Sequence, residues 1–336
     1  MPLNRSRSSG SNPARKWLRP RFILTASALV AGALWLLLRG ASPPSALAAA
    51  GFTAPVTATA SAPEVVYSAF LGDHTHLWAA SPEAPQRPRR IATVPHAEGF
   101  GLRGSLSPDG RLISYMALAR GAYDPATQGV LWLMGTDGAG GRTLADGLDA
   151  LQAPVWSPDG RWVAVRRAHP GTGDLVRYSL LVVDVERGQL SALLPPQAVD
   201  GIYPFGWSTD SGSVYAAVIA GGGTDFLRVP MDGVSTIVAH AGDGIARDFR
   251  LAPDGTRILY NEIPRTTVSD FRLLTVETGS GRVTELHRGP YPMLGPLWRS
   301  NGGGVIAGSG PAGSLGGGLA GFNIDGSSEL ALAALP

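Results

Sequence analysis

The chain has no cysteine, one lysine and few charged residues, with Asp, Glu, Lys and Arg making up 16% of its 336 residues. Without cysteine it cannot form a disulfide scaffold, a thiolate metal site, a cysteine nucleophile or a lipid-modified cysteine. Glycine and proline are abundant instead, at 45 and 27 residues, and 44% of the chain is hydrophobic. This composition favours many short strands joined by turns, in a chain long enough to bury a full core.

Basic charge is concentrated at the amino end. Residues 1–48 hold seven of the 28 basic residues and no acidic residue, which leaves 21 basic against 26 acidic residues in the remainder. A nucleic-acid-binding surface needs an excess of positive charge to neutralise phosphates. We therefore expect no nucleic-acid partner.

Three segments precede the repetitive part of the chain. Residues 1–21 are polar and rich in Ser and Arg, which predicts a disordered cytoplasmic segment. Residues 22–38 are an uncharged apolar run of 17 residues, close to a membrane-spanning length and longer than the apolar core of most signal peptides. The basic residues before this run place the remainder outside the cytoplasm. Residues 39–62, rich in Ala, Pro, Ser and Thr, predict a linker.

The apolar run has two interpretations. As a transmembrane signal anchor it tethers the chain to the cell membrane as a single-pass protein, and its length and the following Arg39 favour this. As a signal peptide it is removed by cleavage after the small residues that end at Ala48, which releases a secreted or periplasmic protein. Both interpretations place residues 49–336 outside the cytoplasm.

A turn motif recurs through the remainder of the chain. Its fullest copy, Trp-Ser-Pro-Asp-Gly-Arg, begins at Trp156, and the Asp or Asn positions of successive copies are separated by 50, 51, 44 and 47 residues. Pro fixes φ, Asp hydrogen-bonds nearby backbone and Gly accepts a positive φ, so the motif predicts a tight turn. The repeated Asp residues are interpreted as structural; they are Asp109, Asp159, Asp210 and Asp254, with Asn301 in the last copy.

Each turn is followed by an apolar strand, a longer connection, a second apolar strand and a Gly-containing hairpin. A repeat of 40–50 residues with four strands is typical of a propeller blade. Six such units lie within residues 63–336, and the first lacks an obvious inner strand, which residues 55–59 would supply. The sequence therefore predicts an all-β propeller of six four-stranded blades, preceded by an amino-terminal hydrophobic helix. Trp156, Trp207 and Trp298 are expected to pack between blades.

The repeated Trp-Ser-Pro-Asp-Gly-Arg motif, with Leu-Trp and Asp-Gly between copies, resembles the TolB-like, WD40-like (PD40) propeller repeat over residues 63–336. The resemblance implies an extracytoplasmic propeller that serves as a binding platform. The separate α/β domain of TolB and the hydrolase domain of propeller-containing peptidases are absent from this sequence.

Loop length distinguishes the two faces expected of the disc. The turns between the first and second strands and between the third and fourth strands of each unit are short and repetitive. The other connections vary in length: 119–129, 166–178, 194–203, 239–248, 263–271 and 287–295. Variable loops on a rigid scaffold usually carry function. The predicted binding face is therefore the one with long connections, with these candidates: His74, His96, Arg120, Tyr123, Arg167, His169, Arg177, Tyr203, Asp243, Arg247 and Tyr291.

Catalytic motifs are missing from the sequence. It has no Gly-x-Ser-x-Gly elbow, no phosphate-binding loop and no His-Glu-x-x-His. His74 and His76 have the spacing of a metal-ligand pair, with His96 in the same unit, but no third ligand is evident. We predict no cofactor and no catalytic residue, and a non-enzymatic platform for a protein, peptide or envelope polymer. The alternative is a hydrolase or lyase at the channel mouth that uses His and Asp on the long connections.

Overall fold

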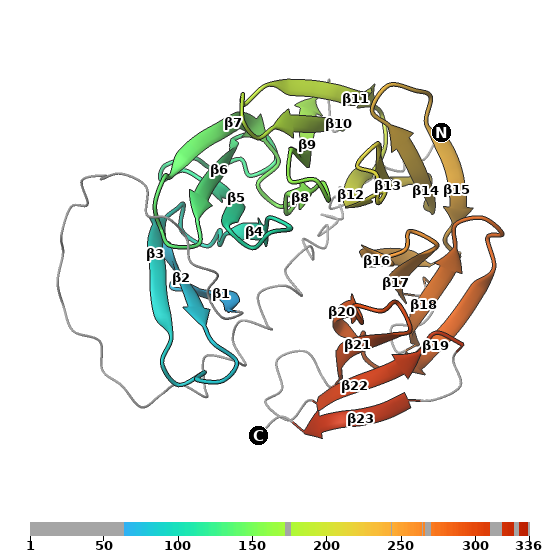
Figure 1. Cartoon of the computed structure of the whole chain (residues 1–336). Coiled ribbons are helices and arrows are strands. Elements are labelled where there is room, and N and C mark those ends of the chain that lie inside the picture. The colour runs from blue at the N-terminus through green and yellow to red at the C-terminus, as the bar shows by residue number, and fades with distance from the viewer. Residues whose placement is uncertain are drawn as a thin grey trace, which may run out of the picture.

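The computed structural model describes residues 64–171, 176–242, 244–263, 265, 270–309, 318–325 and 329–334. These residues form 23 strands in six sheets, arranged as blades around a common axis (Figure 1). Every sheet is an antiparallel meander whose strands follow one another in chain order. The predicted six-bladed β-propeller is confirmed.

Five blades have four strands and blade 1 has three. From the axis outward, the strands are β1 (Val65–Phe70), β2 (His74–Ala80) and β3 (Arg89–Pro95) in blade 1; β4 (Arg103–Leu106), β5 (Leu112–Leu118), β6 (Gly129–Gly135) and β7 (Arg142–Leu148) in blade 2; β8 (Val155–Trp156), β9 (Trp162–Pro170), β10 (Val176–Asp184) and β11 (Leu190–Gln197) in blade 3; β12 (Gly201–Trp207), β13 (Ser213–Ala220), β14 (Gly223–Pro230) and β15 (Thr236–His240) in blade 4; β16 (Ile245–Leu251), β17 (Arg257–Ile263), β18 (Phe271–Glu277) and β19 (Val283–Gly289) in blade 5; β20 (Leu294–Trp298), β21 (Gly304–Ser309), β22 (Gly318–Asn323) and β23 (Glu329–Ala334) in blade 6.

The core of the molecule lies between the blades. Successive side chains of a strand point to opposite faces of its sheet. Because neighbouring blades cover both faces of the middle strands, the sequences of these strands are nearly continuous apolar runs. In β13, Val214 and Ala216 pack toward blade 3, whereas Ala217 packs toward blade 5. Hydrophobic clusters join each consecutive pair from blades 1 and 2 to blades 5 and 6.

The repeated tryptophans link neighbouring blades, as predicted. Each indole N–H donates to a backbone carbonyl on the inner strand of the preceding blade. Trp156 bonds to Ser105 at 3.3 Å and Trp207 bonds to Val155 at 3.0 Å. The indole of Trp298 bonds to the carbonyl of Arg250 at 3.2 Å.

The turn after each inner strand is closed by its repeated polar residues. In the blade 3 copy, the Ser157 hydroxyl donates to Asp159 Oδ1 at 2.5 Å, and the same carboxylate oxygen accepts the Arg161 N–H at 3.0 Å. The Gly position of the motif has a positive φ in all five copies, between 59° and 73°. In blade 4 this position is occupied by Ser211, at 59°, which places a side chain where glycine is ordinarily required.

The predicted inner strand of blade 1, residues 55–59, lies outside the described residues, as do the apolar run 22–38 and the linker 39–62. Within the described part of the chain, no helix has the length and apolar character needed to cross a membrane.

Candidate binding face

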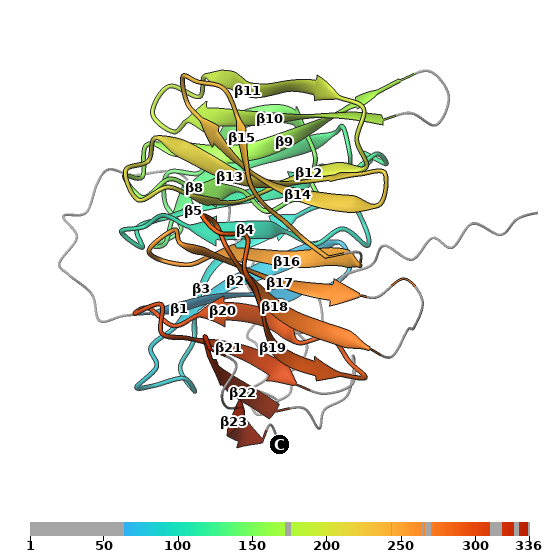
Figure 2. The same cartoon turned by 90° about the vertical axis from the view of Figure 1, so that its right-hand side faces the viewer.

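The two faces of the disc differ in the connections they carry, as the sequence predicted (Figure 2). On one face, the first and third turns of a blade meet: the Thr136 N–H donates to the Arg111 carbonyl at 2.9 Å. We call this the tight-turn face. On the opposite, long-loop face, the β5–β6 loop of blade 2 meets the connection that leads from β7 to blade 3. There the Ala150 N–H donates to the Pro125 carbonyl at 2.7 Å.

Several predicted long loops are in fact extended strands. Strands β9 and β10 continue through most of 166–178, so His169 and Arg177 face each other as register partners rather than lying in a loop. His169 Nε2 lies 2.9 Å from the Ser179 hydroxyl, within the same sheet. Tyr203 and Arg247 likewise lie on the inner strands β12 and β16. The polar side chains of these segments were interpreted as loop residues, but the backbone hydrogen bonds between the strands continue through them.

Three candidates gather around blade 1. His74 Nδ1 lies 2.6 Å from Asp73 Oδ1, and the Arg120 guanidinium donates to the other carboxylate oxygen at 3.0 Å. The hydrogen bond from His74 lowers the pKa of Asp73. His96 is completely buried, so it is unavailable to a partner. Its Nδ1 faces the Ala97 carbonyl, and its Nε2 lies 2.9 Å from the Thr75 hydroxyl.

The suggested metal pair comes together without a third ligand. The rings of His74 and His76 meet edge to face at 5.0 Å. Burial, with the neighbouring His74 and Arg90, lowers the pKa of His76. Within the described ranges, no three His, Asp or Glu side chains gather as a possible cation site. Asp243 lies outside those ranges.

Tyr203 covers a buried ion pair between blades 3 and 4. The guanidinium of Arg166 lies 4.3 Å from the ring centroid of Tyr203 and 5.1 Å from that of Tyr178. Arg166 Nε donates to Asp149 Oδ2 at 2.7 Å, and Nη1 donates to the Ile202 carbonyl at 3.2 Å. Arg166 and Asp149 are only 6% and 2% exposed, so this group acts as a structural latch between blades.

The remaining candidates are spread over the face. Arg167 is held by the backbone carbonyls of Gly147 and Asp146. Tyr123 is 83% exposed and Tyr291 is 45% exposed, and Arg177 and Arg247 are exposed as well. The structure therefore distributes the sequence-predicted residues around the long-loop face and does not bring them into one cluster.

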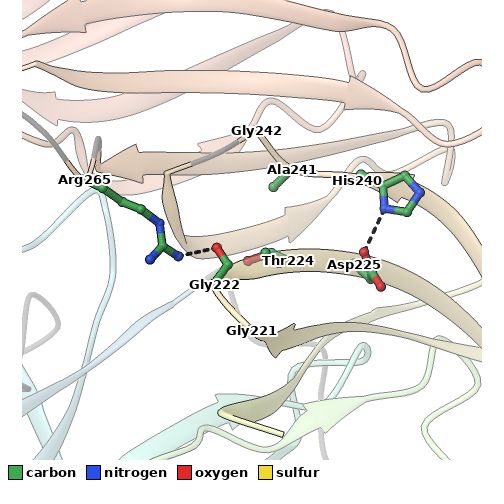
Figure 3. A pocket seen from close by; sticks show the side chains of 9 residues that line it. Gly221, Gly222, Thr224, Asp225, His240, Ala241, Gly242 and Arg265 are labelled. Carbon is green, nitrogen blue, oxygen red and sulfur yellow. Dashed lines mark hydrogen bonds and ion pairs between the residues drawn. The ribbon is translucent and has the colours of Figure 1, made fainter.

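A pocket of about 490 Å³ opens on this face between blades 4 and 5 (Figure 3). Four glycines line it together with these residues: Thr224, Asp225, His240, Ala241 and Arg265. Asp225 and His240 are register partners across β14 and β15, and His240 Nδ1 lies 2.7 Å from Asp225 Oδ1. From the opposite side, the Arg265 guanidinium donates to the Gly222 carbonyl.

Glycine is required at two places in this pocket. Gly222 has a φ of +91°, and a Cβ there would lie 2.7 Å from the Arg265 guanidinium. A Cβ on Gly242 would lie 2.5 Å from Glu262 Oε2. Glu262 is fully buried and is paired with Arg272. The floor of the pocket is thus bare backbone above a buried ion pair.

Sequence reasoning singled out neither this pocket nor its Asp225–His240 pair. The Gly221–Gly223 run followed by Asp225 was a local signal, since glycines expose backbone and Asp is uncommon in a strand. The pairing with His240 depends on strand register, which the sequence does not specify there. The burial of Glu262 had no visible signal either.

No family model matches the chain. Among curated proteins it is 28% identical over 111 residues to dipeptidyl-peptidase 5 of Porphyromonas endodontalis; the match covers 33% of this chain and 16% of the peptidase. The chain thus spans a small part of the length of that relative.

Solved structures share the fold. The crystal structure of TolB from Acinetobacter baumannii matches with a TM-score of 0.58 at 16% identity, covering 77% of this chain and 59% of TolB. Oligogalacturonate lyase from Vibrio parahaemolyticus matches with the same TM-score at 14% identity, covering 81% and 74% of the two chains. At these identities the likeness concerns the fold, and it confirms the TolB-like propeller architecture.

Proposed function

We propose that this chain is an extracytoplasmic propeller that binds a protein or peptide partner on its long-loop face. In this proposal residues 22–38 anchor the chain in the membrane, or cleavage near Ala48 releases it. A polymer of the cell envelope is the other partner that this platform would suit. A fold alone does not define function, so the proposal depends on the surface itself.

The observation that carries the proposal is the set of large apolar side chains exposed on the long-loop face. They stand among arginines at the ends of loops and strands, and they are Phe70, Leu71, Tyr123, Leu151 and Tyr291, each at least 40% exposed. Exposed aromatic residues and arginines are the types enriched in protein interfaces.

The experiment compares the two faces of the disc. The full chain, in its native membrane, is cross-linked and its partners are identified in the wild type and in two double variants. Tyr123→Ala with Tyr291→Ala should abolish a specific cross-link. The matched control, Val234→Ala with Val283→Ala, removes side chains that are 86% and 47% exposed on the tight-turn face. Loss of the cross-link in the control, and its retention in the tyrosine variant, would contradict the proposal.

A second candidate function is a hydrolase or lyase at the same face. The Asp225–His240 pair favours it, because a carboxylate bonded to Nδ1 orients an imidazole so that Nε2 can act as a general base. Two of the similar proteins are named as a peptidase and a lyase. If the chain is an enzyme of this kind, His240→Asn should abolish turnover of a peptide or oligogalacturonate substrate, whereas His169→Asn should leave it unchanged.

A further inference from the structure

Blade 1 differs from the other blades at its inner side. Its sheet consists of β1, β2 and β3, whereas each of the other sheets has four strands. The pairing identifies β1 with the second strand of a complete blade. Tyr67 pairs with Trp78 across β1 and β2, and in blade 2 Tyr115 pairs with Trp132 across β5 and β6. The counterpart of β4 is therefore not among the described strands of blade 1, and the inner edge of β1 pairs with no described strand (Figure 1).

This open edge of β1 presents backbone donors and acceptors. At the hairpin end of the strand, the Leu71 N–H donates to the His74 carbonyl at 2.9 Å. In an antiparallel pair, residues bonded to the partner strand alternate with residues that are not, and the register of β1 and β2 has no irregularity. Val66, Ser68 and Phe70 therefore direct their N–H and C=O groups away from β2, toward the open edge. Such an edge is a template for a further strand.

The side chains along this edge are exposed, whereas their equivalents in blade 2 are buried. Phe70 is 45% exposed, and Val66 and Ser68 are half-buried. The equivalent residues of β5, none of them more than 1% exposed, are Ser114, Met116 and Leu118. In blade 2 this row is paired with the inner strand β4. The exposure in blade 1 is thus that of a second strand without an inner neighbour.

Blade 2 leaves an apolar side chain uncovered beside the same edge. Leu106, at the end of β4, lies opposite Ile113, which packs toward blade 1. In blades 3 and 4 the position of Leu106 is taken by Trp156 and Trp207, which are bonded to the preceding inner strand and are at most 8% exposed. Leu106 is 38% exposed. The edge of β1 is therefore flanked by apolar surface from Leu106 and Phe70.

The repeated turn cannot bring residues 55–59 to this edge. In all five described copies the fourth residue of the turn has a positive φ, and the N–H of the fifth donates to the Asp or Asn side chain. When Tyr67 is aligned with Tyr115, Ala62 takes the fourth position and Pro63 the fifth. Alanine is strained at positive φ, and proline has no N–H to donate. A strand from another molecule needs no such turn.

From these features we infer that the inner edge of β1 binds an extended segment of the protein partner, which adds to blade 1 as its fourth strand. The segment runs antiparallel to β1, as the inner strands of the other blades do, and exchanges main-chain hydrogen bonds with Val66, Ser68 and Phe70. Its apolar side chains cover Phe70 and Leu106. Strand addition at an exposed sheet edge is an established mode of peptide recognition.

The inference deepens the function proposed above and rests on it. Phe70 belongs to the exposed apolar set of the long-loop face, so the edge is continuous with that surface. The edge faces the inside of the ring (Figure 1), where one strand takes up about 5 Å of sheet. A single extended segment fits that position, whereas an intact four-stranded blade of a second copy is too wide for it.

The test measures binding of an extended peptide to the full chain in detergent, by fluorescence anisotropy. The probe is Lys-Val-Thr-Val-Thr-Val-Lys, blocked at both ends and carrying a fluorophore on its first side chain; its β-branched residues favour an extended backbone. A control probe carries a methyl group on every backbone nitrogen between the two lysines, which removes the donors and keeps the side chains. The first probe should bind with a dissociation constant of roughly 10 μM to 1 mM, and the methylated probe should not bind.

Ser68→Pro should weaken binding of the probe roughly 10-fold or more, because it removes the N–H at the centre of the edge. The bonds between β1 and β2 remain, since that N–H does not point toward β2. Ser68→Ala is the matched control; it keeps the N–H and should bind as the wild type does. Circular dichroism and melting of both variants verify the fold.

Hydrogen exchange followed by mass spectrometry gives a measurement that needs no variant. In the free chain, the amides of Val66, Ser68 and Phe70 should exchange rapidly, because no strand protects them. A saturating amount of the probe should slow their exchange at least roughly 10-fold, and the methylated probe should leave it unchanged.

Several results would overturn the inference. They are equal binding of the two probes, equal binding by Ser68→Pro and the wild type, and no binding of the probe at about 5 mM. Slow exchange in the free chain that becomes rapid in Thr57→Pro would assign the edge to residues 55–59 of the same chain. Slow exchange that depends on protein concentration would assign it to a second copy. Failure of the probe with a retained, tyrosine-dependent cross-link would reject strand addition and leave the proposed function standing.

Discussion

Replacing Arg166 by methionine should destabilise the propeller by about 4 kcal/mol. Methionine preserves much of the apolar stem but removes a guanidinium that is 6% exposed. Asp149, only 2% exposed, then loses the bond of 2.7 Å from Nε and its counter-charge. Breaking one side of a buried pair costs about 3–5 kcal/mol. The Ile202 carbonyl also loses its donor, a contribution of about 1 kcal/mol within that range.

The measurement is urea unfolding followed by tryptophan fluorescence, for Arg166→Met, Asp149→Asn and the double variant. Because the double variant leaves no unpaired charge, its loss should be smaller than the sum of the single losses by about 2 kcal/mol. For a domain of this size, a loss of 4 kcal/mol corresponds to a melting temperature lower by about 8 °C. Arg167→Met is the matched control; it removes a neighbouring, partly exposed arginine and should cost about 1 kcal/mol or less.

The loss in Arg166→Met should also depend on pH. Burial raises the pKa of Asp149, and the Arg166 charge opposes that rise. Without the arginine, the carboxyl takes up a proton at a higher pH, and a neutral carboxyl needs no counter-charge. The difference from the wild type should therefore shrink as the pH falls through the raised pKa of the carboxyl in the variant, and it should stop changing below the lower pKa of the same carboxyl in the wild type. A single-variant loss under about 1 kcal/mol, or strictly additive losses, would refute the assignment of this pair as a latch.

The repeated turns give two further predictions. Hydrogen bonds from Ser107 and Ser208 lower the pKa values of Asp109 and Asp210, so the stability they confer is present above their unfolded pKa of about 3.9 and is lost as the pH falls through the lower folded values. The free energy of unfolding, measured in urea by circular dichroism, should therefore begin to fall near pH 4, and a variant with Asn at both positions should show a flatter acid dependence. Gly160→Ala should lower stability by about 1 kcal/mol in urea unfolding, because its φ is +71°; an unchanged midpoint would contradict this cause.

The blade count could be predicted because the turn motif supplies its own geometry. Three of the five copies share the hydrogen bond from Ser to Asp within the turn, and the Asp or Asn and the residue of positive φ recur in all five, so the copies can be found without knowledge of distant contacts. The inter-blade tryptophans were likewise predictable, since a large aromatic residue recurs at a fixed place before the turn.

Partners that are distant in the sequence could not be predicted in the same way. His96 looked like an exposed loop histidine, but Thr75, on another strand, satisfies its ring and the site is fully buried. The Asp225–His240 pair depends on the register of β14 and β15, which shifts between Phe226 and Leu227. A one-residue shift in register moves a side chain to the opposite face of a sheet. Composition and spacing contain no information about such a shift.

The indole bonds have a consequence for how such a ring varies. Each runs from one blade to the preceding blade, so a duplicated blade would carry its own hydrogen bond to the blade before it. Two junctions depart from this rule, because Leu106 takes the tryptophan position between blades 1 and 2 and Leu251 takes it between blades 4 and 5. At the second of these junctions, Leu251 rests on Gly206, where an added Cβ would lie 2.6 Å away.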